Sequence, residues 1–289
     1  MAEAGIFEKL IYLFKSTRPL NIVMVTAGIL ITILIGTESL GSLRITVPAL
    51  IAAVAISSAG NSINDYYDID IDKVNKPEKP LPSGKLKKNE MLYFSIILFA
   101  LGIGVSFLLP YLCIFLAVIN SVLLWLYASE LKRSGFLGNI IISYLVASVF
   151  IFGAAAIGNL LIGVFLAVVA FFTNASRELL KDLEDIKGDK EFGAETFPMI
   201  IGSKKKTIVV IDSFLIVAVL ISPLPYLIGL LSLYYMVFAV VADLVMGLVV
   251  YSVSHRSTLK TIKRNQKRVK IAALIGLLAF LAGIVPFTL

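Results

Sequence analysis

The sequence is poor in nitrogen and sulfur ligands and in charge. Its 289 residues include one His, one Cys and one Trp, and only 16% of them are charged. A single thiol, Cys113, excludes an intrachain disulfide, and His255 with one Cys cannot build the usual His- and Cys-rich site for zinc or copper. About a quarter of the residues are charged in an ordinary soluble domain. The low charge, together with 58% hydrophobic residues, indicates an integral membrane protein.

Long apolar runs account for most of the chain. A helix needs roughly 17 to 25 apolar residues to cross about 30 Å of hydrocarbon, and nine runs meet this need. They cover approximately residues 20–36, 45–63, 91–109, 111–128, 139–157, 160–176, 207–225, 227–251 and 270–287. The weakest boundary lies at Pro223 and Pro225, since two prolines in three residues stop one helix and start the next. The predicted fold is therefore all-α, a single membrane domain over residues 1–289 with nine transmembrane helices.

The distribution of positive charge predicts how these helices are oriented. All but one of the 26 Lys and Arg residues, Arg44, fall on alternate sides of the predicted membrane. This pattern places the amino terminus in the cytoplasm with the long polar loops 64–90, 177–206 and 252–269, and the carboxyl terminus outside. The same distribution accounts for the net charge of +7, because the basic residues flank the membrane spans, where they set the orientation of the helices and contact anionic lipids. We expect no nucleic-acid partner and no obligate protein partner, and an interfacial amphipathic segment over residues 1–19.

Two acidic stretches follow the second and the sixth of these spans. They are NSINDYYDIDID, from Asn61 to Asp72, and RELLKDLEDIKGD, from Arg177 to Asp189. As helices, each stretch would align three ligands on one face, namely Asn64, Asp68 and Asp72, and Asp182, Asp185 and Asp189. Because spans two and six share one predicted orientation, both faces would lie at the same membrane surface. This arrangement suggests a metal held between them.

The candidate ligands are almost wholly oxygen, which suits magnesium. They are Asn64, Asp65, Asp68, Asp72, Asp182, Asp185 and Asp189. Mg²⁺ often takes one or two carboxylates and completes its octahedron with water and substrate phosphate oxygens, so this metal implies a phosphate. The alternative is that each acid is solvated and paired with a lysine such as Lys73 or Lys181. That alternative is weaker for two aligned stripes than for a single Asp.

These motifs resemble those of the UbiA superfamily of intramembrane prenyltransferases along almost the entire chain. Residues 64–72 match the family's first N-D-x-x-D-x-x-x-D motif, and residues 181–189 match the second. The lysine- and proline-rich loop that follows the first motif is also similar, although Lys76 and Lys79 stand where arginine is expected. The resemblance implies nine helices around a central cavity, and transfer of a prenyl group from its diphosphate to a lipophilic acceptor.

The resemblance also implies roles for individual residues. The motifs would hold Mg²⁺ ions that bridge the diphosphate, with four catalytic carboxylates, Asp68, Asp72, Asp185 and Asp189. The candidate substrate-binding residues are Asn61, Tyr67, Lys73, Lys79, Tyr127, Lys132, Asn139, Arg177 and Lys181. Six aromatic residues near the expected mouth are available to shield an allylic carbocation, although packing is the simpler role for any one of them: Tyr66, Tyr67, Tyr127, Tyr144, Phe171 and Phe172.

The acceptor is the harder question. Arg177 and Lys181 lie four residues apart on one helix face, where they suit a second phosphate. The form R-E-x-x-K-D-x-E-D is similar to the archaeal branch of the family, in which geranylgeranyl diphosphate alkylates a hydroxyl of geranylgeranylglyceryl phosphate to form an ether lipid. Both cations could instead pair with Glu178, Asp182 and Asp185 nearby.

Two other functions stay open at this point. An aromatic acceptor, as in quinone or in chlorophyll- and heme-type synthesis, would leave Arg177 and Lys181 without a role. A divalent-cation transporter is less favoured, because the acids gather at one membrane face and the outer loops carry no comparable ligands. Asp212 and Asp243 lie within predicted spans but outside both motifs, and we expect Asp243 to make a hydrogen bond between helices.

Overall fold

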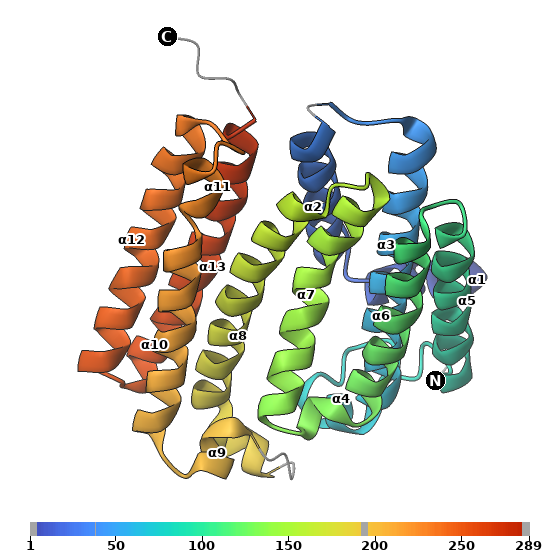
Figure 1. Ribbon diagram of the computed structural model, residues 1–289. Helices are drawn as coiled ribbons and strands as arrows, with labels where there is room; N and C mark the ends of the chain where they lie inside the picture. The colour runs from blue at the N-terminus through green and yellow to red at the C-terminus, as the bar shows by residue number, and fades with distance from the viewer. Residues whose placement is uncertain (1–4, 38, 192–195, 285–289) are drawn as a thin grey trace.

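Helices make up most of the computed structural model. The structure describes residues 5–37, 39–191 and 196–284, and for residues 187–191 it describes the backbone alone. The elements in chain order are α1 (Ile6–Ser16), α2 (Pro19–Thr37), α3 (Leu43–Tyr67), α4 (Ile69–Asn75), α5 (Lys88–Ser106), α6 (Tyr111–Ser129), the 3-10 turn η1 (Leu131–Arg133), α7 (Phe136–Ala156), α8 (Leu160–Glu191), α9 (Phe197–Ile201), α10 (Lys204–Ile221), α11 (Leu224–Leu227), α12 (Leu233–His255) and α13 (Leu259–Ala282). The long helices run side by side as one bundle (Figure 1). The all-α prediction is confirmed.

Eight helical segments in the described residues are long and apolar enough to cross a membrane. They are α2, α3, α5, α6, α7, α8, α10 continued by α11, and α12, and they match the first eight predicted spans. The ninth predicted span, 270–287, overlaps the second half of α13. The first half of α13 is basic, so part of the segment predicted as a polar loop at 252–269 is helical. The protein is a multi-pass membrane protein.

The other two segments predicted as cytoplasmic loops, 64–90 and 177–206, are also partly helical. The long helix α3 continues through Tyr67 into the first acidic stretch, and α4 follows it at once. The helix α8 runs for 32 residues, well beyond the predicted end at 176. Residues 177–187 contain no proline or glycine and are rich in Glu, Leu and Lys, which are strong helix formers. Both acidic stretches are therefore carried on helices that continue from the apolar spans of the bundle.

Small residues bring α3 and α5 close together. Ala49, Ala52 and Ala59 on α3 are fully buried, and Gly102 on α5 packs against α3 at Ala52 and Ile56. A Cβ atom at Gly102 would lie 2.9 Å from the carbonyl oxygen of Ala52 and 2.6 Å from the side chain of Ile56. Small residues at such crossings are typical of membrane helices, because they let backbones approach closely. This contact fixes the position of α3 and of the acidic stretch at its end.

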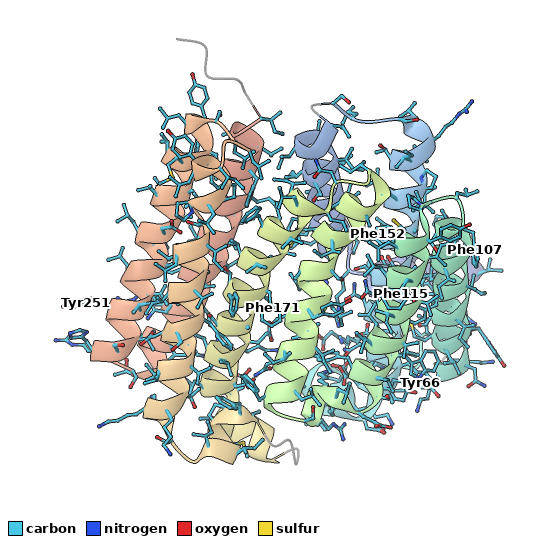
Figure 2. All side chains as sticks on the ribbon, in the orientation of Figure 1. Tyr66, Phe107, Phe115, Phe152, Phe171 and Tyr251 are labelled. Carbon is cyan, nitrogen blue, oxygen red and sulfur yellow. The ribbon has the colours of Figure 1, made fainter. Side chains whose placement is uncertain are left out.

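Apolar side chains also cover the outside of the bundle. Phe115 on α6 and Tyr251 on α12 are 61% and 63% exposed, whereas Phe152 on α7 is 3% exposed. Figure 2 shows Tyr251 at the outer margin of the bundle and Phe152 within it. An apolar exterior of this extent fits a lipid environment.

The two acids outside the motifs bond to neighbouring helices. The Asp243 carboxylate on α12 accepts a hydrogen bond of 2.5 Å from the hydroxyl of Ser222 at the end of α10, which confirms the expected interhelical contact. Asp212 on α10 accepts one from Ser254 on α12, also at 2.5 Å. Both contacts join the same pair of helices, which is consistent with a packing role.

Candidate active site

The first acidic stretch lies at a break between two helices. The helix α3 ends at Tyr67, Asp68 adopts φ −82° and ψ 1°, and α4 begins at Ile69. The backbone N–H groups of Asp68 and Asp72 still donate to the carbonyl oxygens four residues earlier. The predicted alignment of Asn64, Asp68 and Asp72 is therefore largely kept across the break. The amide of Asn64 donates to Asp68 Oδ2 at 2.7 Å.

Two lysines from elsewhere in the chain neutralise these carboxylates. Lys79 donates to Asp72 Oδ2 at 2.6 Å and to Asp65 Oδ1 at 3.1 Å. Lys132 donates to Asp68 Oδ2 at 2.5 Å. Burial lowers the pKa of Lys79, but its hydrogen bond to Asp72 and the charge of Asp65 outweigh that effect and leave the pKa above its ordinary value. Asp68 and Asp72 are both buried, and a buried carboxylate needs such a partner.

The second acidic stretch lies on one continuous helix, α8. Asp182 accepts a hydrogen bond of 2.7 Å from the amide of Asn139, and Lys181 and Asp185 lie on the same helix. Arg177 forms an ion pair of 2.5 Å with Glu178, as the weaker alternative for this residue predicted. The side chain of Asp189 lies outside the described residues.

A single short segment touches both acidic stretches. It is formed by η1 and the first turn of α7, and it carries Lys132, which contacts Asp68, and Asn139, which contacts Asp182. The segment folds tightly, because a Cβ atom at Gly138 would lie 2.4 Å from the carbonyl oxygen of Leu131. The structure thus brings Lys132 and Asn139 to the two acidic stretches, and their predicted contact with substrate stays a prediction.

Tyr127, at the end of α6, lies between the two stretches. Its phenol is within electrostatic reach of Asp68 from the first stretch and of Asp182 and Glu178 from the second. Tyr67 packs edge-on against Trp125, with ring centroids 6.4 Å apart. Tyr67 therefore lies in the first acidic stretch itself, at the end of α3, and Tyr127 lies at the end of α6.

Two of the predicted substrate-binding residues contact partners outside the cluster of buried carboxylates, and their predicted role is not tested by these contacts. Asn61 accepts from Asn21 at 3.3 Å and donates to the carbonyl oxygen of Thr17 at 3.0 Å, which ties the turn between α1 and α2 to α3. Lys73 pairs with Asp70 at 2.8 Å, and both side chains are largely exposed. Neither contact reaches the buried carboxylates.

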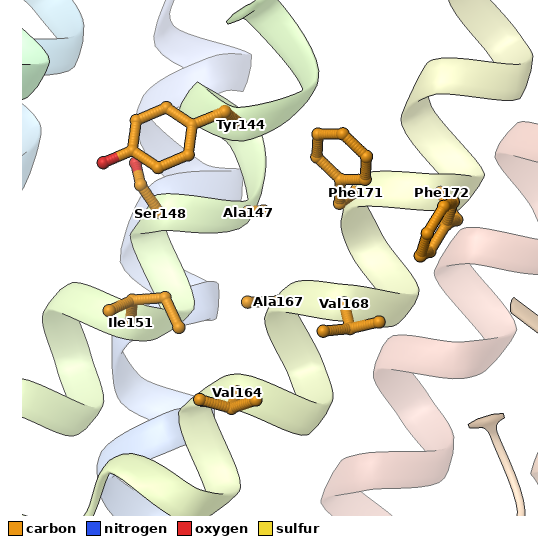
Figure 3. A pocket seen from close by; sticks show the side chains of 9 residues that line it. All are labelled: Tyr144, Ala147, Ser148, Ile151, Val164, Ala167, Val168, Phe171 and Phe172. Carbon is orange, nitrogen blue, oxygen red and sulfur yellow. The ribbon is translucent and has the colours of Figure 1, made fainter. Parts of the chain in front are cut away.

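An apolar cavity of about 200 Å³ lies between α7 and α8. Tyr144 and Ser148 line it from α7, and Val164, Phe171 and Phe172 line it from α8. Figure 3 shows the rings of Tyr144 and Phe171 on the two facing helices. Three of the aromatic residues predicted to shield a cation therefore line one cavity, on the two helices that carry Asn139 and Asp182.

Arg18 is a member of this site that the sequence did not reveal. Its guanidinium lies 3.4 Å from Asp65 Oδ1, and its φ of +56° is unusual for a residue other than glycine. Arg18 precedes Pro19, the first residue of α2. The Arg-Pro pair closes the predicted interfacial segment of residues 1–19, and the backbone restriction that a proline imposes on the residue before it is the signal in the sequence for a sharp turn there.

The side chains of the two acidic stretches have the oxygen donors that a hard divalent cation prefers. In this structure, the buried carboxylates of the first stretch are paired with lysines. Within the described part of the chain, no three His, Cys, Asp or Glu side chains form a group able to hold a metal ion. The donors are nevertheless all oxygens, and among the described residues the buried pair Asp68 and Asp72 contacts the ammonium groups of Lys79 and Lys132 and the amide of Asn64. Such a donor set fits Mg²⁺ once the lysines move toward another anion.

The whole bundle matches a known family. The model of the UbiA prenyltransferase family matches residues 22–274, from α2 into α13. The chain belongs to the UbiA prenyltransferase family. The resemblance inferred from residues 64–72 and 181–189 is thereby confirmed.

Two relatives within the UbiA family that are similar to this chain share one enzyme name. Digeranylgeranylglyceryl phosphate synthase of Methanococcoides burtonii is 42% identical over 84% of this chain and 86% of its own length. The enzyme of the same name from Methanopyrus kandleri is 37% identical over 92% of this chain and 97% of its own length. Both alignments cover most of each protein.

Solved structures agree with the fold. One described as digeranylgeranylglyceryl phosphate synthase in membranes has a TM-score of 0.87 and 34% identity, covering 96% of this chain and 99% of its own. A UbiA homologue from Archaeoglobus fulgidus bound to DMAPP and Mg²⁺ has a TM-score of 0.71 and 15% identity over 93% of this chain and 98% of its own. At that identity, the second structure supports the fold of this UbiA family member alone.

Proposed function

We propose that this protein transfers a geranylgeranyl group from its diphosphate to a hydroxyl of geranylgeranylglyceryl phosphate, forming an ether lipid. The observation that carries the proposal is the segment from η1 to α7, where Lys132 contacts the first acidic stretch and Asn139 contacts the second. These two contacts support a single site formed by both motifs. The relatives named digeranylgeranylglyceryl phosphate synthase supply the substrate class.

Mg²⁺ is the cofactor that these residues would hold. The ligands would come from Asn64, Asp65, Asp68 and Asp72 in the first stretch and from Asp182, Asp185 and Asp189 in the second. When bound, Mg²⁺ supplies positive charge that stabilises the departing diphosphate. Lys79 and Lys132, which now neutralise the carboxylates, would then be free to donate to the phosphate oxygens.

The reaction breaks the bond between the first prenyl carbon and the diphosphate oxygen, and the electron pair leaves with the diphosphate. The acceptor hydroxyl oxygen then bonds to that carbon and releases its proton. Lysine ammonium groups beside the diphosphate stabilise the transition state more than the ground state, because negative charge gathers there as the bond breaks. Tyr127 and the rings near the cavity between α7 and α8 would keep water from the cationic carbon.

The phosphate of the acceptor would be held at the start of the second stretch. Arg177 and Lys181 stand on one face of α8, and Arg177 is 38% exposed beyond its ion pair with Glu178. A guanidinium that keeps part of its surface free can bind a second anion without losing the first. An aromatic acceptor without a phosphate would make no use of these two cations.

The orientation in the membrane is part of the proposal. The distribution of Lys and Arg places the amino terminus and both acidic stretches in the cytoplasm and the carboxyl terminus outside. The site would then open to the side from which soluble diphosphates arrive. Labelling of single cysteines introduced at residue 85 and near the carboxyl terminus, in a Cys113→Ser background in intact cells, would test this topology.

A direct assay tests the activity. Purified full-length protein is incubated with geranylgeranyl diphosphate and geranylgeranylglyceryl phosphate, with and without Mg²⁺, and the products are identified by mass spectrometry. The expected result is an ether lipid and diphosphate only when Mg²⁺ is present. Absence of this product, or a product formed only with an aromatic acceptor such as a hydroxybenzoate, would contradict the proposed acceptor. Mg²⁺ flux into sealed vesicles, undiminished by prenyl diphosphate, would favour transport.

A further inference from the structure

The amphipathic helix α1 presents an apolar side that no described part of the chain covers. Ile6, Phe7, Leu10 and Phe14 are all more than half exposed. The opposite side is fastened to the bundle, since Lys9 pairs with Glu90 of α5 at 2.7 Å and Ser16 bonds to Ser62 of α3 at 3.0 Å. A fastened helix with an exposed apolar side is typical of an element that lies in the membrane interface.

A groove separates α1 from the start of α5. Its volume is about 330 Å³, and four of the six residues that line it are apolar. These residues are Ile6, Lys9, Leu10, Leu13, Leu86 and Glu90. Its two charged members pair with each other, so the rest of the groove offers an apolar surface of the kind that an acyl chain covers.

Three lysines gather around two tyrosines beside this groove. Lys15 and Lys85 lie 5.9 and 5.4 Å from the ring centroid of Tyr12. Lys88 lies 4.6 Å from the ring centroid of Tyr66. All three ammonium groups belong to exposed residues, and the described part of the chain gives none of them an ion pair. Glu90 pairs with Lys9 and Asp70 with Lys73, although the charge of Lys88 also acts on Asp70.

We propose that this place binds an anionic phospholipid of the surrounding membrane. The phosphate of the headgroup would lie among Lys15, Lys85 and Lys88, and one acyl chain would lie along the groove beside Leu10 and Leu86. Charge complementarity favours an anion, because the three cations lie over two tyrosines of one apolar cluster and form no ion pair in the described part of the chain. The adjoining groove favours a lipid over free phosphate, because only a lipid also covers apolar surface.

The bound lipid would help to hold α1 in its position against α5. This helix leads directly to Arg18, which contacts Asp65, and Tyr66 under Lys88 belongs to the first acidic stretch. A lipid that bridges Lys15 of α1 and Lys88 of α5 therefore holds together two elements that border the candidate active site. The proposed lipid site lies outside the cluster of buried carboxylates.

Native mass spectrometry of the full-length protein tests this inference with two lipids, dioleoylphosphatidylglycerol and dioleoylphosphatidylcholine. The test variant is K15Q/K85Q/K88Q. The matched control, K205Q/K260Q/K267Q, removes the same charge from exposed lysines of α10 and α13. Wild type and control should retain the anionic lipid in preference to the neutral one, and the test variant should lose that preference by about tenfold or more. Equal melting temperatures in phosphatidylcholine show that all three are folded.

Two further arms identify the source of the phosphate. The substitution Leu10→Gln should weaken retention of phosphatidylglycerol several-fold without changing charge, because it makes the groove polar. Inorganic phosphate at millimolar concentration should not displace the lipid. Equal losses in the two triple variants would show a general effect of surface charge and overturn the inference. Displacement by inorganic phosphate with no effect of Leu10→Gln would overturn the assignment to a lipid.

Discussion

The Nζ atom of Lys132 lies 2.5 Å from Oδ2 of Asp68, although 64 positions of the chain separate the two residues. This ion pair connects the turn between α6 and α7 to the first acidic stretch. A bound cation and a diphosphate would compete for the same two groups, the cation for Asp68 and the phosphate for Lys132. The pair is therefore the element of the site whose partners should change most when substrates bind.

Asp68→Asn should lower turnover by about a hundredfold or more, because a neutral amide supports a divalent cation poorly. The substitution keeps the shape of the side chain, so the protein should still insert and fold. The matched control is Asp70→Asn in the same stretch, since Asp70 is exposed and its ion pair is with exposed Lys73. Initial rates at saturating Mg²⁺ measure the effect. Similar rates for both variants would remove Asp68 from the metal site.

Lys132→Met separates the two roles of the lysine. Removing the ammonium group frees Asp68, so Mg²⁺ should bind the substrate-free protein about two- to fivefold more tightly, the range expected for a partly exposed ion pair. The KM for the prenyl diphosphate should rise by about tenfold, because a charge-assisted hydrogen bond to the diphosphate is lost.

The control for this prediction is Arg133→Met, the neighbouring cation, which is exposed. Calorimetric titration gives the Mg²⁺ affinity, and steady-state rates give the KM. If Lys132 only stabilises the fold, the melting temperature falls and neither binding constant changes in the stated direction. That result would contradict a direct contact with the diphosphate.

Arg177→Leu tests the assignment of the acceptor phosphate. The KM for geranylgeranylglyceryl phosphate should rise by about tenfold, while the KM for the diphosphate donor should change little. Arg256→Leu, at an exposed residue after α12, is the control for loss of one positive charge. If Arg177 serves only as the ion-pair partner of Glu178, both KM values will stay the same and only stability will fall.

The positions of helices and acidic motifs could be predicted because they depend on local patterns. Apolar runs locate the spans, and a spacing of four residues aligns Asn64 with Asp68. The break at Asp68 could not be predicted in this way, since the stretch from Leu43 to Asn75 contains no glycine or proline near that point. The spacing of Asp182, Asp185 and Asp189 predicts a helical second stretch, but the apolar run ends at residue 176, so hydropathy alone does not predict that α8 continues without a break to Glu191.

Contacts between distant segments depend on packing, and the sequence alone does not specify them. Lys79 was predicted as a phosphate ligand from its motif, but its two carboxylate partners follow from the way the loop folds back over α4. Arg18 reaches Asp65 only because α1 turns sharply into α2 at a residue with positive φ. The aromatic residues Tyr144, Phe171 and Phe172 share a cavity because α7 and α8 pack together.

The tight turn that carries Lys132 and Asn139 gives a test of the geometry itself. A Cβ atom at Gly138 would lie 2.4 Å from the carbonyl oxygen of Leu131, so Gly138→Ala should push η1 away from α7 and cost about 1–3 kcal/mol of stability. Both contacts that the segment makes with the acidic stretches should weaken, and turnover should fall with them. Gly104→Ala in α5 is the matched control, because a Cβ atom there meets nothing within 4 Å. It should leave activity unchanged and raise stability by about 0.5–1 kcal/mol, since alanine favours a helix over glycine. Melting temperature and initial rate, measured on the same preparations, distinguish the two variants. A Gly138→Ala protein with normal turnover would show that the joined arrangement of the two stretches does not depend on this turn.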